Sequence, residues 1–302
     1  MEILAFFKLI RWKNLLLIIY IQVLLKFLVF TSFNISTNLS LIQFIALLIS
    51  TILITSAGYI INDIYDLNSD LINKPKKVIV SKQFSIAKAQ QLYFFLNTLG
   101  IILGIGLSLN IEKPSYSFIF IGASLLLYYY SKKFKSKPLI GNLIVSFLIA
   151  ISILVLYFFD INKTVQSFNL QLVINVILIL SFFAFSINFI REIVKDIEDV
   201  NGDNSLNMKT LPILIGEARS KKIASLLCVI PLSLLLYIIL NFSETYKYTA
   251  LYLVVFTVIP LLYVALKLQT ITLKKEFKKV SLFLKIIMFL GISTLILFSL
   301  NN

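Results

Sequence analysis

The sequence predicts an all-α protein that crosses a lipid bilayer many times. Its 302 residues are 59% hydrophobic, and the mean hydropathy is +0.94. A soluble domain is about 45–50% apolar, so a soluble fold of this length could not bury so much apolar surface. The apolar runs are long enough for membrane-spanning helices, and they lack the alternating pattern of β-barrel strands.

Nine apolar runs define the expected spans, and together they form one domain over 1–302. We expect membrane helices at 15–33, 40–62, 86–110, 115–131, 139–159, 169–192, 221–241, 247–268 and 280–300. The fourth run is short. The stretch 204–220 is apolar only in "LPILIG", so we interpret it as a connecting segment that contains at most a short helix.

Basic residues alternate from one connection to the next, and this alternation orients the chain. Lysines and arginines are frequent before the first expected helix and after the second, fourth, sixth and eighth, whereas the other connections carry one or none. Short loops rich in Lys and Arg stay in the cytoplasm. The pattern predicts a multi-pass protein of the cell membrane with a cytoplasmic N-terminus.

Composition also excludes several kinds of site. The chain has no histidine and one cysteine, which argues against His-ligated haem or zinc and leaves no intramolecular disulfide. The net charge of +14 is explained by the cytoplasmic loops and by anionic membrane lipids, without a nucleic acid partner.

Acidic residues are concentrated in two short stretches, each following an even-numbered helix and hence on the cytoplasmic side. The first is "NDIYDLNSD" at 62–70, and the second is "REIVKDIEDVNGD" at 191–203. Eight of the fourteen Asp and Glu residues lie in them. Positions four apart share one helix face, so Asn62, Asp66 and Asp70 point the same way, and Glu192, Asp196, Asp199 and Asp203 do likewise.

Carboxylates beside a carboxamide, without His or Cys, suit a hard cation such as Mg²⁺. Two such clusters facing each other could hold ions with a diphosphate clamped between them. An apolar cavity between the helices would then hold a hydrocarbon tail. The pattern therefore predicts a site for a polyprenyl diphosphate.

At these residues the sequence resembles the UbiA superfamily of intramembrane prenyltransferases. The motif N-D-x-x-D-x-x-x-D is matched by Asn62, Asp63, Asp66 and Asp70, and K-D-x-x-D-x-x-G-D is matched by Lys195, Asp196, Asp199, Gly202 and Asp203. The segments "RWKN", "YSKKFKSKPLIGN" and "KTLPILIGEARSKK" resemble further family segments, so the likeness covers nearly the whole chain. Within the superfamily, "SINFIREIVKDIEDVNGD" looks most like the geranylgeranylglyceryl phosphate geranylgeranyltransferases of ether-lipid synthesis.

The resemblance implies nine helices around a central cavity that opens to lipid, and a Mg²⁺-dependent transfer without a covalent intermediate. Expected metal ligands are Asn62, Asp66, Asp70, Asp196, Asp199 and Asp203, and expected diphosphate contacts are Lys135, Lys195, Arg11 and Lys74. The sequence departs from the family pattern where lysines at 74 and 77 replace arginines, which keeps the charge but loses the bidentate fork. Lys82 stands where the family has a glycine, which puts the geometry of that turn in doubt.

The expected reaction ionises the allylic C–O bond, and an acceptor nucleophile then attacks the carbocation. Asp66, Asp199 and Asp63 are the candidate catalytic residues, with Asp63 or Asp199 as the base for a glycerol hydroxyl. Because Asp63 lies on a different helix face from Asn62, a direct metal contact is less expected for it.

Two alternatives stay open at this stage. The acceptor could be an aromatic ring in quinone synthesis instead of a lipid. In a different functional class, the acids could line the ion path of a cation transporter. No acid lies at mid-span on the far side, so the sequence contains no visible path through the membrane.

Overall fold

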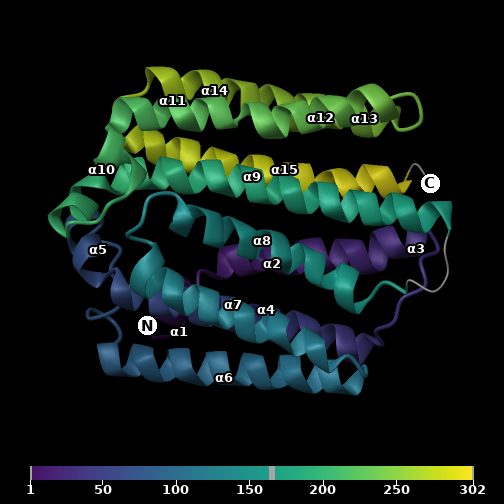
Figure 1. Ribbon diagram of the computed structural model, residues 1–302, viewed down its shortest axis with the longest axis horizontal. Coiled ribbons are helices and arrows are strands. Elements are labelled where there is room, and N and C mark those ends of the chain that lie inside the picture. Colours follow the sequence, from purple (N-terminus) through teal and green to yellow (C-terminus); the bar gives the residue numbers. More distant parts are fainter. Residues whose placement is uncertain (1, 163–166, 301–302) are drawn as a thin grey trace.

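The fold was analysed in a computed structural model, which describes residues 2–162 and 167–300. Long helices lie roughly alongside one another, and short helices cap the bundle at one end (Figure 1). Over the described residues the only β-pairings are two isolated bridges. The all-α prediction is therefore confirmed.

The N-terminal half supplies three long helical segments. A short helix, α1 (Glu2–Leu9), precedes the first span, which runs through α2 (Trp12–Val23), the π-helical turn η1 (Leu24–Val29) and α3 (Phe30–Ser32). Next come α4 (Leu41–Tyr65), α5 (Leu67–Asn73) and α6 (Ile86–Asn110). Helix α4 begins with a capping box at Ser40. The Ser40 hydroxyl accepts a hydrogen bond from the Gln43 backbone N–H, and the Gln43 side-chain oxygen accepts one from the Ser40 backbone N–H.

The central part of the chain forms α7, α8 and α9, which lie around the interior of the bundle. The short fourth run forms a 3-10 turn (Pro114–Tyr116), α7 (Ser117–Tyr129) and a π-helical turn (Tyr130–Phe134). It is followed by α8 (Ile140–Phe159) and α9 (Phe168–Ser205).

The C-terminal part packs over one side of the bundle. It comprises α10 (Leu211–Ile215), α11 (Glu217–Leu227), α12 (Val229–Phe242), α13 (Lys247–Leu253), a π-helical turn (Val254–Val258), α14 (Ile259–Thr270) and α15 (Lys274–Leu300). Helix α15 packs along α9 and brings the C-terminal part to the centre of the molecule (Figure 1).

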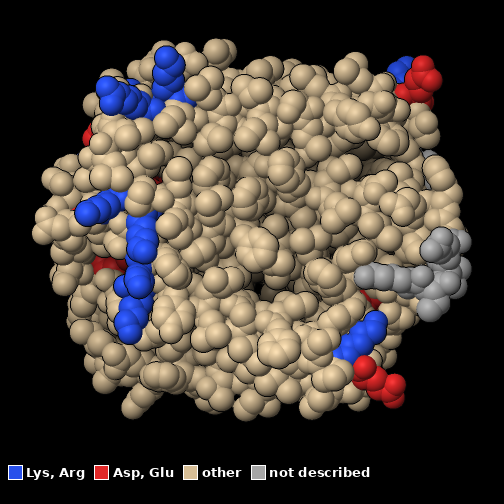
Figure 2. Space-filling model, viewed as in Figure 1, with Lys and Arg blue, Asp and Glu red and all other residues tan. Residues whose placement is uncertain are grey.

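Eight helices of the described chain are long and apolar enough to cross a membrane. They correspond to eight of the nine expected runs, and the run expected at 115–131 is helical without being among them. The expected total of nine spans, and the cytoplasmic side of the N-terminus, remain predictions. On the face shown in Figure 2, Lys and Arg gather toward the end that carries α5 and α10, beside a broad uncharged belt.

Helix α9 is longer than the sequence indicated. The expected helix ended at residue 192, whereas α9 continues to Ser205 and carries the second acidic motif on its last three turns. The polar residues there resemble a loop, but Ile190, Ile193, Val194 and Ile197 are all buried. Their spacing gives one apolar stripe, and packing that stripe keeps the polar extension helical.

A buried ion pair lies at the end of the bundle opposite α5. Lys26, in the π-helical turn of the first span, donates to the carboxylate of Asp160 at 2.9 Å and to the carbonyl of Leu39 at 2.9 Å. Asp160 is fully buried. The pair ties the first span to the end of α8, and each charge neutralises the other in a place where an isolated charge would be costly.

Candidate functional site

A cavity of about 740 Å³ lies between α2, α4, α7, α8, α9 and α15. Its inner part is apolar, with Leu17, Ile54, Phe120, Leu148 and Met288 among the lining residues. Its other part is lined by the charged residues of both acidic motifs. A cavity of this size and polarity is typical of a binding site for a molecule with an apolar body and an anionic head.

The first acidic motif spans the junction of α4 and α5. The helical hydrogen bonds continue through this junction, since the Asp66 amide donates to Asn62 at 2.8 Å and the Asp70 amide donates to Asp66 at 2.8 Å. All three side chains line the cavity, which confirms that they share one face. The Asn62 amide also donates to the Asp66 carboxylate at 2.6 Å.

The second motif faces the first across the cavity from the extended end of α9. Asp196, Asp199 and Asp203 line the same cavity. Asn142 at the start of α8 donates to the Asp196 carboxylate at 2.8 Å. The long continuous helix, which the sequence did not predict, therefore places this motif opposite the first.

Four residues that we call the α5–α9 clamp fix the spacing between the motifs: Ser69, Asn73, Gly202 and Asp203. The Asn73 amide donates to the Asp199 carbonyl at 2.8 Å, and its oxygen accepts from the Gly202 amide at 3.0 Å. Ser69 donates to the Asp203 carboxylate at 3.0 Å. The clamp depends on the absence of a side chain at 202, because a Cβ there would lie 2.7 Å from Asn73 Cγ.

One lysine is paired with each acidic motif. Lys135 forms an ion pair with Asp66, and Lys74 reaches from the end of α5 to Asp199 at 2.6 Å. Burial lowers the pKa of Lys135, but the Asp66 carboxylate outweighs that effect and raises it overall. Burial, together with the charge of Asp66, raises the pKa of Asp70. Each lysine is thus held against a carboxylate of one acidic motif.

The donor set of this region fits a hard cation. Five carboxylates, at positions 66, 70, 196, 199 and 203, line the cavity together with the lysines at 74, 76, 77 and 135, which leaves one negative charge in excess. Within 2–162 and 167–300, the Asn62 carboxamide oxygen is buried without a hydrogen-bond partner. Three acids do not by themselves converge on one point anywhere in this part of the chain. Carboxylate and carboxamide oxygens are nevertheless the donor types that Mg²⁺ prefers.

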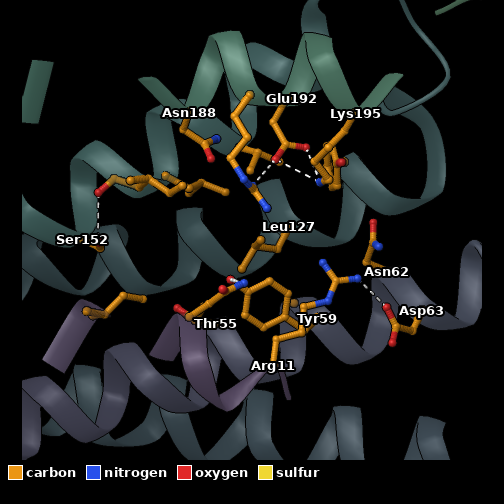
Figure 3. A pocket seen from close by; sticks show the side chains of 18 of the residues that line it. Arg11, Thr55, Tyr59, Asn62, Asp63, Leu127, Ser152, Asn188, Glu192 and Lys195 are labelled. Carbon is orange, nitrogen blue, oxygen red and sulfur yellow. Dashed lines mark hydrogen bonds and ion pairs between the residues drawn. The ribbon is translucent and has the colours of Figure 1, made fainter. Parts of the chain in front are cut away.

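Arg11 and Lys195, two of the expected diphosphate contacts, are each paired with a carboxylate in the structure. The Arg11 guanidinium pairs with Asp63 at 2.7 Å and lies 4.8 Å from the centre of the Tyr59 ring (Figure 3). Burial would lower the pKa of Arg11, but the Asp63 carboxylate raises it overall. Lys195 pairs with Glu192 at 2.8 Å. Both cations line the cavity, and both are paired with carboxylates outside the six expected metal ligands.

Sequence reasoning missed several polar residues that line the cavity, namely Asn14, Ser69 and Lys285, or that hydrogen-bond to its acidic motifs, namely Asn142 and Asn73. Asn142 and Asn14 lie in segments that it did single out, but it gave them no role. Lys285 lies in the apolar run "VSLFLKIIMFL", where a single cation is a signal that could have found it. Ser69 and Asn73 follow polar loop-like sequence, so only the packing of α5 on α9 identifies them.

The chain is similar to known proteins over most of its length. The model of the UbiA prenyltransferase family matches residues 23–291. A digeranylgeranylglyceryl phosphate synthase of Methanobrevibacter smithii is 38% identical over 232 residues, which cover 76% of this chain and 77% of that protein. A protein of the same name from Saccharolobus solfataricus is 39% identical over 180 residues, which cover 59% of this chain and 58% of that protein.

Two solved structures share the arrangement of helices. One, described as a digeranylgeranylglyceryl phosphate synthase in membranes, aligns with a TM-score of 0.65 at 26% identity over 100% of this chain and 99% of that one. A UbiA homologue from Archaeoglobus fulgidus, bound to DMAPP and Mg²⁺, aligns with a TM-score of 0.56 at 16% identity over 96% of this chain and 99% of that one. The second likeness shows the fold alone.

Proposed function

The chain belongs to the UbiA prenyltransferase family, and on that premise we propose that it transfers a geranylgeranyl group from its diphosphate to geranylgeranylglyceryl phosphate. The observation that carries the proposal is the meeting of two acidic motifs at the mouth of one apolar cavity. Such a cavity fits a donor with an anionic head and a long hydrocarbon tail. The names of the M. smithii and S. solfataricus relatives support the lipid acceptor.

Magnesium is the proposed cofactor, held by Asn62, Asp66 and Asp70 from one side and by Asp196, Asp199 and Asp203 from the other. Mg²⁺ bound there would bind the diphosphate and neutralise the negative charge that develops on it as a leaving group. The buried, unpartnered carboxamide oxygen of Asn62 supports this set. The A. fulgidus homologue, which was solved with DMAPP and Mg²⁺, supports a divalent ion in this fold.

The chain's own residues bind and orient the diphosphate. Lys135 and Lys74 lie among the acidic motifs, so they are the cations placed to contact its oxygens and to stabilise them as the C–O bond breaks. The electron pair of that bond leaves with the diphosphate. The acceptor hydroxyl oxygen forms the new ether bond, and its proton passes to a carboxylate, for which Asp63 and Asp199 are the candidates.

The end of the bundle opposite α5 provides an observation against the transporter alternative. A transporter requires a polar path through the protein, whereas the charges of Lys26 and Asp160 at this end are buried and engaged with each other. This pairing favours a site that opens on one side only. An aromatic acceptor remains an alternative that the assay below tests directly.

The test uses purified protein in lipid with Mg²⁺ and radiolabelled geranylgeranyl diphosphate. Geranylgeranylglyceryl phosphate and 1,4-dihydroxy-2-naphthoate are offered in parallel. We expect product with the glycerophosphate lipid alone, its loss in Asp66→Ala, and its retention in Glu244→Ala, which removes an exposed acid. Product with the naphthoate alone would replace the lipid acceptor by an aromatic one. No product with either acceptor, and no Mg²⁺-dependent binding of the diphosphate, would refute the proposal.

A further inference from the structure

A second charged group lines the cavity beside the acidic motifs, and its sign is opposite. We call it the basic cluster: Arg11, Arg191, Lys195 and Lys285, with the carboxylates of Asp63 and Glu192. Asn188, Glu192 and Lys195 extend from one helix toward Arg11, Tyr59 and Asp63 on the other side (Figure 3). The cavity therefore has an acidic region and a basic region.

The carboxylates of the basic cluster are shared among more cations than they can neutralise. Glu192 pairs with Arg191 at 2.9 Å and with Lys195 at 2.8 Å. Asp63 is paired with Arg11. In the described part of the chain, Lys285 has no carboxylate partner, and its ammonium donates to the carboxamide oxygen of Asn14.

Two of these cations belong to long membrane helices: Arg191 lies at the end of the apolar run 169–192, and Lys285 lies within the run 280–300. Arg191 belongs to α9 and Lys285 to α15. At a rise of about 1.5 Å per residue, Lys285 lies roughly 8 Å inside its apolar run, measured from residue 280. A cation at such depth is costly, and it is retained where it faces an interior cavity with a function.

The contrast with Lys26 shows what the basic cluster lacks. Lys26 is also inside a span, but it is fully matched by Asp160. The basic cluster has four cations and two carboxylates, which leaves an excess of about two positive charges. In addition, the buried Arg191 Nε has no hydrogen-bond partner among the described residues. A bound anion would neutralise the excess positive charge and accept a hydrogen bond from Arg191 Nε.

A phosphate monoester supplies an anion of matching charge, about −1.5 to −2 near neutral pH. We propose that Arg191 and Lys285, assisted by Arg11, bind the phosphate group of the prenyl acceptor. The proposal rests on the proposed function, and it assigns the acceptor its own anion site apart from the donor diphosphate.

The spacing along α9 allows both anions to be bound together. At about 1.5 Å per residue, Arg191 lies roughly 8 Å from Asp196 and roughly 12 Å from Asp199 along the helix axis. An acceptor whose phosphate is held at Arg191 would have its glycerol hydroxyl between the two regions. The attacking oxygen would then face the carbon that loses the diphosphate.

The test compares two acceptors in the full-length protein in lipid: geranylgeranylglyceryl phosphate and the same lipid without its phosphate. We expect the wild-type protein to prefer the phosphorylated acceptor at least tenfold in kcat/KM. In Arg191→Gln/Lys285→Gln, kcat/KM for the phosphorylated acceptor should fall about 10- to 100-fold, since charge-assisted hydrogen bonds are lost. The value for the dephosphorylated lipid, and KM for the donor, should change less than about threefold.

Controls separate this site from the donor site and from misfolding. Lys275→Gln removes an exposed lysine from the same helix and should behave as the wild-type protein does. Arg191→Lys and Lys285→Arg keep the charge and should keep most of the preference for phosphate. If the glutamine variants do not fold, inhibition of the wild-type protein by inorganic phosphate provides the test. Inorganic phosphate should compete with the acceptor and not with the donor.

Several outcomes would overturn the inference. One is an equal loss of kcat/KM for both acceptors in the glutamine variant. Another is a rise in the donor KM that matches that loss. The third is competition of inorganic phosphate with the donor alone. These outcomes leave the proposed function intact, because the wild-type protein still makes product. The absence of wild-type product from either acceptor would refute the proposed function and with it this subsite.

Discussion

The α5–α9 clamp makes Gly202 the position where a single methyl group should separate the two acidic motifs. In Gly202→Ala the new Cβ would lie 2.7 Å from Asn73 Cγ and 2.8 Å from the Ser69 carbonyl oxygen. Ordinary contacts between carbon atoms are about 3.5–4.0 Å, so α5 and α9 must move apart by roughly 1 Å. Backbone atoms cannot rotate away, which means that a side-chain adjustment alone does not relieve the overlap.

The cost follows from the contacts that this movement strains. Overpacking of a tight contact costs about 1–3 kcal/mol. Loss of the two hydrogen bonds of Asn73 to the backbone of Asp199 and Gly202 adds about 1 kcal/mol each. We expect Gly202→Ala to lower the free energy of unfolding by about 3–5 kcal/mol. A 1 Å displacement of reacting groups can cost about 100-fold in rate, so kcat/KM should fall by a comparable factor.

The assay measures thermal unfolding and prenyl transfer in parallel, with Gly106→Ala as the matched control. Gly106 also lies within a helix, but a Cβ there would meet nothing within 4 Å. That substitution should be neutral or stabilise by about 0.5–1 kcal/mol. Adding Asn73→Ala to Gly202→Ala should recover part of the loss, because one of the two overlapping groups is removed. Wild-type activity and stability in Gly202→Ala would refute the reasoning.

Three further predictions concern the charged groups. Lys26→Met should lower the free energy of unfolding by about 3–5 kcal/mol, because it leaves Asp160 buried without its partner; thermal unfolding measures this, and an unchanged melting temperature would contradict it. Lys135→Met should raise KM for the prenyl diphosphate about 10-fold or more, since it removes a charge-assisted contact, while KM for the acceptor should stay within about threefold in the same steady-state assay. Chelation of divalent ions should abolish donor binding in the wild-type protein, and added Mg²⁺ should restore it there but not in Asp66→Ala; calorimetric binding that is insensitive to chelation would remove the metal from the proposal.

Much of the site could be predicted from the sequence because its signals are local. The spacing of Asn62, Asp66 and Asp70 is a property of one helix, so it specifies a shared face before any tertiary structure is known. The apolar runs, the alternation of basic loops and the concentration of acids are likewise readable along the chain. These features predicted the all-α membrane fold, whereas the family was predicted from the resemblance of the two acidic motifs and further segments to known family motifs.

The extent of α9 was not predicted, for a physical reason. Residues 193–205 have the composition of a loop, and a helix there depends on burying Ile193, Val194 and Ile197 against other elements. Tertiary packing overrides the local propensity at such a boundary. The helical spacing of the second motif could therefore be recognised along the chain, but the continuous helix that positions it could not.

The sequence alone determined which residues carry charge, which segments are apolar and which polar groups share a helix face, because each of these depends on neighbours along the chain. Only the tertiary structure decided how the charges are shared. It assigned Arg11 to Asp63 and Lys74 to Asp199, and it brought Lys285 from the last helix to the first span. These pairs join residues on different helices, and their separation in space depends on how whole helices pack, which no local pattern encodes.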